Sequence, residues 1–252
     1  MNFDEYTRFA DLSFEDFKRM AKDNSLSCYE KIGFPNSYRQ GKEKLIFEDI
    51  LCKIPSLHQR NKTVLDIGSG CSELPRMLID WCGKQGHTLL LVDSEEMLSH
   101  LPDEPFIKKF TGLYPQQSEE VFKWHLHQVD IILAYSIFHY IFVEANVWEF
   151  LDCSLELLAD GGEMLIGDIP NISKRKRFFS SSTGIQFHKE FTQSQENPEI
   201  IFNKVERHKI DDSVMISLII RARNQGFDAY IVPQPADLPM ANRREDILIR
   251  KP

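Results

Sequence analysis

The 252-residue sequence has no apolar run long enough to span a membrane. It also lacks the charged and then apolar amino terminus that directs secretion, any internal repeat and any low-complexity tract. We therefore expect neither a secreted protein nor a membrane protein, and a cytoplasmic location. A chain of this length can bury one sizeable core and keep a few dozen residues for a cap.

Cysteine is scarce, and none of the five cysteines belongs to a C-x-x-C pair. An odd count without motif spacing favours a reducing compartment over a disulfide framework or a zinc site. His125 and His127 alternate on a strand-like segment, but this pattern alone is too weak to indicate a metal. We expect no bound metal.

Positive charge is also in short supply: 30 lysines and arginines stand against 38 acidic residues, a formal net charge of −8. Affinity for nucleic acid depends on a basic surface that releases counterions. The balance argues against a nucleic-acid partner, and we expect a small-molecule partner instead. The sequence does not predict an oligomeric state.

The most informative segment is a glycine-rich turn between a predicted strand and a predicted helix. The apolar run 63–67 contains Asp66 and breaks into Gly68 and Gly70, and apolar residues at helical spacing follow over 73–81. Such a turn lets a ligand lie against bare backbone, because no Cβ obstructs it. The next predicted strand, 88–92, ends at Asp93, an acid suited to accept hydrogen bonds from ribose hydroxyls. Together these features predict a nucleoside-bearing cofactor.

The spacing of the glycines in this turn helps to distinguish one nucleoside-bearing cofactor from another. A dinucleotide site has G-x-G-x-x-G set for a pyrophosphate, whereas here Ser72 stands two positions beyond Gly70. Asp66, two residues before the first glycine, suits an amine-bearing or cationic ligand better than a phosphate. The run VLDIGSG, with Asp93 after the next strand, resembles motif I and the following acidic position of the class I S-adenosylmethionine-dependent methyltransferases. A glycine turn of an unrelated α/β protein is the alternative.

The resemblance implies S-adenosylmethionine as the cofactor. In that family the glycine loop lies beside the methionine part, and the second acid holds both ribose hydroxyls; a third glycine often stands where this chain has Ser72. We also expect the amino-terminal segment to reach the methionine carboxylate. The expected cofactor-binding residues are Tyr38, Arg39, Asp66, Gly68, Gly70, Asp93, Ser94, Gly112, Leu113, Tyr135 and Ser136.

The rest of the chain predicts an α/β fold. Further strands are expected at 106–111, 129–134, 163–168, 230–232 and 246–250, and helices at 42–54, 94–101, 148–158 and 211–224, with a long polar stretch after Asp168. The alternation implies a doubly wound, mostly parallel sheet, and the final strand pair implies one antiparallel member. The family has seven strands with the last antiparallel, and the resemblance covers residues 45–251.

The amino-terminal residues 1–40 are expected to form a helical cap on a methyltransferase domain at 41–252. An apolar stripe at Phe14, Phe17, Met20 and Ala21 follows a candidate N-cap at Ser13. A solvated connector with aromatic anchors is the alternative.

Two basic loops suggest the acceptor. One follows the strand that ends at Asp168, and the other precedes the last strand; their residues are Lys174, Arg175, Arg177, Arg243 and Arg244. Both loops are expected at the ligand edge of the sheet, where arginine can bind phosphate or carboxylate through two hydrogen bonds. This predicts an anionic acceptor, and the alternative is a solvated surface turn.

Methyl transfer is an in-line displacement, so the enzyme mainly holds the nucleophile aligned. A hydroxyl nucleophile also needs a base, and the candidates are His139, Asp168 and His188. Alternatively, His139 has no catalytic role and packs within an aromatic patch. We predict O-methylation of a sugar, a nucleotide-linked sugar or a phosphorylated metabolite in a bacterial polysaccharide or secondary-metabolite pathway. A catalytically silent methyltransferase-like binding subunit and an NAD-dependent dehydrogenase are the alternatives.

Overall fold

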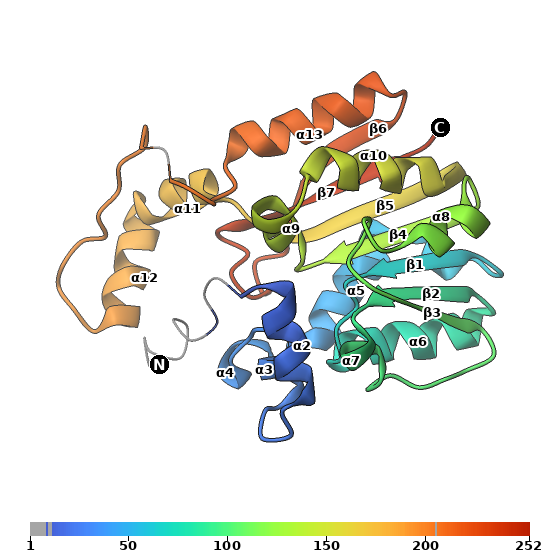
Figure 1. Cartoon of the computed structure of the whole chain (residues 1–252). Helices are drawn as coiled ribbons and strands as arrows, with labels where there is room; N and C mark the ends of the chain where they lie inside the picture. The colour runs from blue at the N-terminus through green and yellow to red at the C-terminus, as the bar shows by residue number, and fades with distance from the viewer. Residues whose placement is uncertain (1–8, 10–11, 205) are drawn as a thin grey trace.

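A computed structural model describes residues 9, 12–204 and 206–252 of the chain (Figure 1). Its centre is a seven-stranded sheet in the order β3-β2-β1-β4-β5-β7-β6. Strands β1 to β5 are parallel neighbours, while β7 runs antiparallel to both β5 and β6, so the expected sheet is confirmed. The strands are β1 (Thr63–Ile67), β2 (Thr88–Asp93), β3 (Ile107–Thr111), β4 (Val129–Tyr135), β5 (Leu158–Pro170), β6 (Asp228–Pro233) and β7 (Arg244–Arg250).

Helices cover both faces of the sheet. Side chains alternate along a strand, so Val64 packs on one face with Ile46 and Leu78, and Leu65 packs on the other with Phe150. The first face is covered by α5 (Glu43–Lys53), η1 (Pro55–His58), α6 (Glu73–Gln85) and α7 (Glu95–Leu98). The second is covered by α8 (Glu119–His125), α9 (Phe138–Glu144), α10 (Val147–Leu157) and α13 (Asp212–Asn224).

Three short helices precede this core: α2 (Phe14–Lys22), α3 (Cys28–Lys31) and α4 (Asn36–Arg39). Ser13 caps α2 as expected, because its hydroxyl accepts the Asp16 N–H at 3.2 Å and its own N–H bonds Asp16 Oδ2 at 2.9 Å. Figure 1 shows the three helices at the same end of the sheet as α9. Residues 1–8 and 10–11 of the expected cap segment lie outside the described residues.

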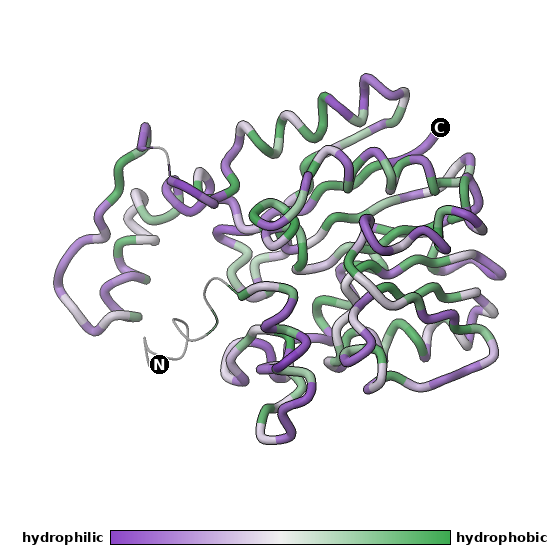
Figure 2. The backbone as a smooth tube through the Cα atoms, viewed as in Figure 1, coloured by the Kyte–Doolittle hydropathy of each residue, from purple (hydrophilic) through white to green (hydrophobic). Residues whose placement is uncertain are grey.

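The polar stretch after Asp168 departs from expectation, because it contains two helices, α11 (Ile172–Phe179) and α12 (Ser182–Thr192). The Asn171 side chain starts α11 by accepting the N–H groups of Ser173 and Lys174, and Ser181 caps α12. Helices α8 and α9 were also not expected, and α7 is shorter than the predicted helix. These segments are too short or too charged for a clear apolar period; in Figure 2 the loop after α12 is mostly hydrophilic, unlike the strands. No helix in the described part of the chain is both long and apolar enough to cross a membrane.

Candidate active site

A cavity opens where β1, β2 and β4 end. It encloses about 1000 Å³, including its open mouth. The segments after β1, β2, β3 and β4 supply one part of its lining, and α2, the segment 32–39 and α9 supply the rest. Eight of the predicted cofactor residues line it: Arg39, Gly68, Gly70, Asp93, Gly112, Leu113, Tyr135 and Ser136.

The glycine loop needs both of its glycines. Gly68 and Gly70 have φ angles of 69° and 66°, in the left-handed region that favours glycine. A Cβ on Gly68 would lie 2.7 Å from a methyl of Ile137 at the start of α9, and one on Gly70 would lie 2.8 Å from a methyl of Ile32. The bare backbone therefore lets α9 and the amino-terminal segment approach the loop closely.

Asp93 presents its carboxylate to the cavity from the end of β2. Its Oδ2 accepts the Gly70 N–H at 2.8 Å, and its Oδ1 accepts the Ser94 N–H at 2.6 Å. Burial raises the pKa of Asp93 to about 6, although these hydrogen bonds oppose the shift. A carboxylate can accept about four hydrogen bonds, so it can still receive two hydroxyl donors such as a ribose diol.

Arg39 supplies a buried cation to the same cavity. Its Nε donates to Glu43 Oε1 at 2.9 Å, and its Nη1 lies 3.4 Å from Ser136 Oγ and 3.8 Å from Asp168 Oδ2. Glu43 in turn accepts the hydroxyl of Ser72 at 3.0 Å, directly after the glycine loop. A guanidinium has five N–H donors, more than these contacts use, so it can also hold a ligand carboxylate.

Three predicted cofactor residues do not line the cavity. Tyr38 is buried and stacks on Phe34 with ring centroids 5.3 Å apart. Ser94 caps α7 by accepting the Met97 N–H at 3.2 Å. Asp66 lies in a small separate pocket below the loop, where burial raises its pKa to about 7. These side chains sit behind the lining rather than in it.

Neither predicted catalytic histidine lines the cavity. The His139 ring packs on Tyr140 with centroids 3.8 Å apart, and burial lowers the pKa of His139 to about 3. A neutral imidazole with such a low pKa is a weak base. His188 lies on α12, where its ring meets that of Phe179 at 6.1 Å.

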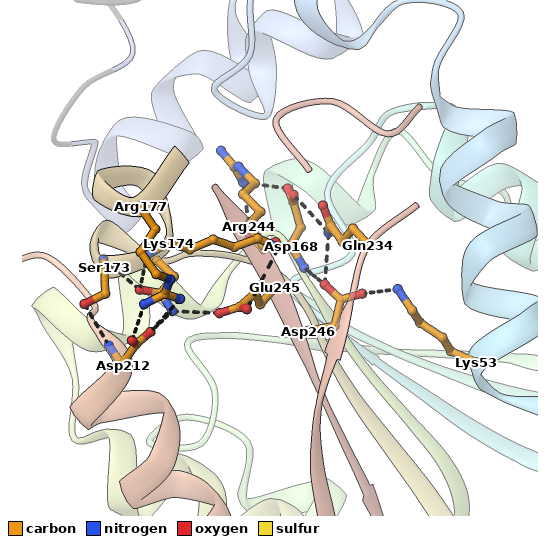
Figure 3. Close-up of polar contacts among 11 residues, drawn as sticks. Lys53, Asp168, Ser173, Lys174, Arg177, Asp212, Gln234, Arg244, Glu245 and Asp246 are labelled. Carbon is orange, nitrogen blue, oxygen red and sulfur yellow. Dashed lines mark hydrogen bonds and ion pairs between the residues drawn. The ribbon is translucent and has the colours of Figure 1, made fainter. Parts of the chain in front are cut away.

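Asp168, the third catalytic candidate, belongs to a buried polar network (Figure 3). Its Oδ2 lies 2.6 Å from Arg244 Nη1 and accepts the Ser136 hydroxyl at 2.5 Å, and its N–H donates to Asp246 Oδ1 at 2.7 Å. Lys53 completes the network with a 2.6 Å contact to Asp246 Oδ2. Ser136 and Asp168 both have positive φ, 62° and 60°, which costs about 1–3 kcal/mol each and persists only where neighbours enforce it. Asp168 therefore fixes the strand ends, and its carboxylate is already engaged rather than poised as a base.

The two basic segments, which the structure forms as part of α11 and the start of β7, lie side by side, since Lys174 Nζ donates to the Arg244 carbonyl at 2.8 Å. Their charges are nevertheless directed to partners within the protein. Arg177 pairs with Asp212 at 2.5 Å and Arg244 with Asp168, while Arg175 and Arg243 lie over the Phe179 ring at 5.1 and 5.7 Å. None of the five predicted substrate residues lines the cavity. The structure does not assemble the expected anion site from them.

Sequence reasoning missed an aromatic part of the lining. The apolar stripe of α2 was expected, yet Phe14 and Phe17 face the cavity, where Phe17 meets Tyr140 edge to face at 4.9 Å. The Phe14 N–H donates to Glu144 Oε2 at 3.2 Å, which joins the start of α2 to the end of α9. Phe34 lines the cavity beside them, 4.9 Å from the Arg39 guanidinium. Within the described ranges, no group of three His, Cys, Asp or Glu side chains could hold a metal ion.

This sheet, with β7 antiparallel and the ligand cavity at the ends of β1, β2 and β4, defines the class I methyltransferase fold. The structure of the plantazolicin methyltransferase BpumL with S-adenosylhomocysteine matches 98% of this chain and 98% of its own, with TM-score 0.57 and 14% identity. The CurJ carbon methyltransferase matches 98% of this chain and 67% of its own, with TM-score 0.57 and 13% identity. The N-methyltransferase NodS from Bradyrhizobium japonicum WM9 matches 85% and 98%, with TM-score 0.51 and 15% identity. No family model and no curated protein matches the sequence.

Proposed function

We propose that this protein binds S-adenosylmethionine in the cavity and transfers its methyl group to a small-molecule acceptor. The observation that carries the proposal is the convergence of the glycine loop, Asp93 and Arg39 on one cavity at the carboxyl ends of the strands. Solved structures of the same fold, such as that of BpumL, hold S-adenosylhomocysteine, the demethylated product. S-adenosylmethionine supplies an electrophilic methyl carbon; the protein supplies position and exclusion of water.

The lining fits this cofactor part by part. Asp93 accepts the ribose hydroxyls, and Gly112 and Leu113 after the neighbouring β3 flank the adenosine end. The Arg39 guanidinium receives the methionine carboxylate, and Glu43 and Ser136 hold that guanidinium in place. Residues 1–40 act as a cap in this proposal and residues 41–252 as the methyltransferase domain, since Phe14, Phe17 and Ile32 of the cap line the cavity.

A dehydrogenase and a silent binding subunit remain as competing functions. The turn lacks the third glycine of a pyrophosphate site, and the cavity presents Asp93 and Arg39 in places that suit a ribose and a carboxylate. Titration calorimetry tests the dehydrogenase alternative, whereas the silent subunit is tested by methyl transfer itself. We expect S-adenosylhomocysteine to bind at micromolar or lower concentration and NAD to bind at least about a hundredfold more weakly, a gap of ~2.7 kcal/mol. Equal binding of NAD would favour the dehydrogenase.

The pH dependence of cofactor binding provides a second test. The pKa of Asp93 is raised to about 6 by burial, so this carboxyl takes up a proton as the pH falls through 6. The ionised form accepts the ribose hydroxyls, and affinity for S-adenosylhomocysteine should therefore fall roughly tenfold between pH 7 and pH 5. Calorimetry at several pH values measures this change. Asp93→Asn is the control: its amide does not titrate, so a tenfold fall that persists in that variant would assign the effect to another group.

A further inference from the structure

Beside the residues assigned to the cofactor, the cavity has an aromatic wall formed by Phe14, Phe17, Phe34 and Tyr140. The wall is rigidly built: Phe17 and Tyr140 meet edge to face at 4.9 Å, and Phe34 is stacked on buried Tyr38 at 5.3 Å. Packed rings of this kind give a large apolar contact and recognise flat apolar molecules. An acceptor with an apolar, aromatic body would fit this wall.

The charged side chains that line the cavity limit which charge the acceptor can carry. The charged side chains among the described residues that line it are Arg39, Asp93 and Glu144. The first two serve the cofactor under the proposed function. Glu144 remains, at the exposed end of α9, where its carboxylate accepts the backbone N–H of Phe14 at 3.2 Å. An anionic acceptor would meet this carboxylate and no spare cation, whereas a cationic amine is attracted to it.

The protonation states of the lining groups bear on which atom is methylated. A hydroxyl acceptor needs a general base with a pKa near neutrality. His139 lies outside the cavity, and Asp168 is held by Arg244. The carboxyl of Asp93, whose pKa burial raises to about 6, is assigned to the ribose under the proposed function. Burial raises the pKa of Tyr140 to about 12, so this phenol can donate a hydrogen bond but does not take up a proton. A neutral amine needs no general base during the transfer, because its nitrogen lone pair is nucleophilic as it stands. A neutral hydroxyl, in contrast, must lose its proton as it attacks.

We infer that the acceptor is an amine on an apolar, aromatic small molecule and that its nitrogen receives the methyl group. The inference rests on the proposed function and names the substrate of the same cavity. The ammonium loses a proton to Glu144 or to water at the rim. The nitrogen lone pair then forms the N–C bond while the C–S bond breaks. The electron pair of the C–S bond stays on sulfur. The product is a methylated ammonium, which keeps its own protons, so one proton in all is released for each methyl group transferred.

Three indoles that differ only in their head group test the inference. Protein loaded with S-adenosylhomocysteine is titrated by calorimetry with tryptamine, tryptophol and indole-3-acetate, and with methylamine as an amine that lacks the ring. We expect tryptamine to bind at least about tenfold more tightly than indole-3-acetate, because like charges at Glu144 repel the carboxylate. Methylamine should not bind measurably. With S-adenosylmethionine present, mass spectrometry should find the methyl group on the tryptamine amine.

Glu144→Gln separates the head-group contact from the packing. Glutamine keeps an oxygen that can accept the Phe14 N–H, so α2 and α9 stay joined. Tryptamine should bind this variant roughly fivefold more weakly, as for one ion pair at a partly exposed site, while tryptophol and S-adenosylhomocysteine bind as before. Glu149→Gln, an exposed change on α10 outside the cavity, is the matched control and should leave all affinities unchanged.

The outcomes are distinct. Binding of indole-3-acetate or tryptophol as tight as that of tryptamine overturns the inference, and so does the absence of any indole binding to protein that holds S-adenosylhomocysteine. Failure of S-adenosylhomocysteine itself to bind refutes the proposed function, and the inference falls with it.

Discussion

Replacing Arg244 with alanine is expected to lower the free energy of unfolding by about 3–5 kcal/mol, the largest stability effect that we predict. The guanidinium of Arg244 is buried and lies 2.6 Å from Asp168 Oδ2, and it also donates to the Asp168 carbonyl at 3.0 Å. Its removal leaves a buried carboxylate whose remaining side-chain partners are the more distant cation of Arg39, at 3.8 Å, the hydroxyl of Ser136 and the amide of Gln234, at 3.5 Å. Unpaired charge in the interior is costly because water no longer solvates it.

Urea unfolding followed by circular dichroism measures this loss, with Arg177→Ala as the matched control. Arg177 also pairs with an aspartate, Asp212, but both side chains are exposed, so its loss should cost about 1 kcal/mol or less. The double variant Arg244→Ala with Asp168→Asn should lose less than the two single changes added together, since the second change removes the stranded charge. Similar losses for Arg244→Ala and Arg177→Ala would show that burial does not set the strength of the Asp168 pair.

The largest effect on binding is expected for Asp93→Ala, which should weaken S-adenosylmethionine binding by about 2 kcal/mol or more, close to thirtyfold. The variant removes a carboxylate that would accept two ribose hydroxyls. It also leaves two backbone N–H groups without an acceptor. In the wild type, Gly70 and Ser94 donate these groups to Asp93 at 2.8 and 2.6 Å. The glycine loop loses its anchor to β2 as well as its contact with the ribose.

Calorimetry with S-adenosylhomocysteine measures the affinity, and thermal unfolding shows whether the variant is folded at the temperature used. Asp93→Asn keeps the shape and one acceptor oxygen, so it should fold better than the alanine variant and still bind the cofactor poorly. Asp80→Ala, at an exposed position on α6, controls for the general loss of one acidic charge. An Asp93→Asn protein that is folded and binds as tightly as the wild type would remove Asp93 from the cofactor site.

The sheet and the glycine loop could be predicted because their signals are local in the sequence. Each central strand is a short apolar run. Gly68 and Gly70 follow β1 within three positions, and Asp93 is the last residue of β2. Parallel strands bring their carboxyl ends to one edge, so order along the chain was enough to place these residues together. The structure confirms that all three line one cavity.

The fate of the basic residues could not be predicted, because it depends on partners that are distant in the sequence. Arg177 is neutralised by Asp212, 35 positions later, and Asp168 by Arg244, 76 positions later. A run of positive charge says nothing about which acids will fold against it. The sequence therefore suggested an anion site where the structure has internal ion pairs.

The aromatic wall was missed for a different reason. The periodicity of α2 shows that Phe14 and Phe17 share one face of a helix, but not whether that face meets the core or a cavity. The position of Tyr140 depended on α9, a helix of seven residues that is too short for a clear periodic signal. Orientation relative to a second element is a tertiary property, and no pattern within either segment contains it.

The place of β7 in the sheet sets the order in which a chain leaving the ribosome can complete this fold. β7 lies between β5 and β6, and β6 has no other neighbour in the sheet. Because synthesis proceeds from the amino terminus, β6 emerges first and has no strand to pair with until β7 follows it. Asp168 likewise waits for Arg244 and Asp246, which both belong to β7. The glycine loop can thus form early in translation, whereas the strand ends beside it become fixed only when the last strand has been made.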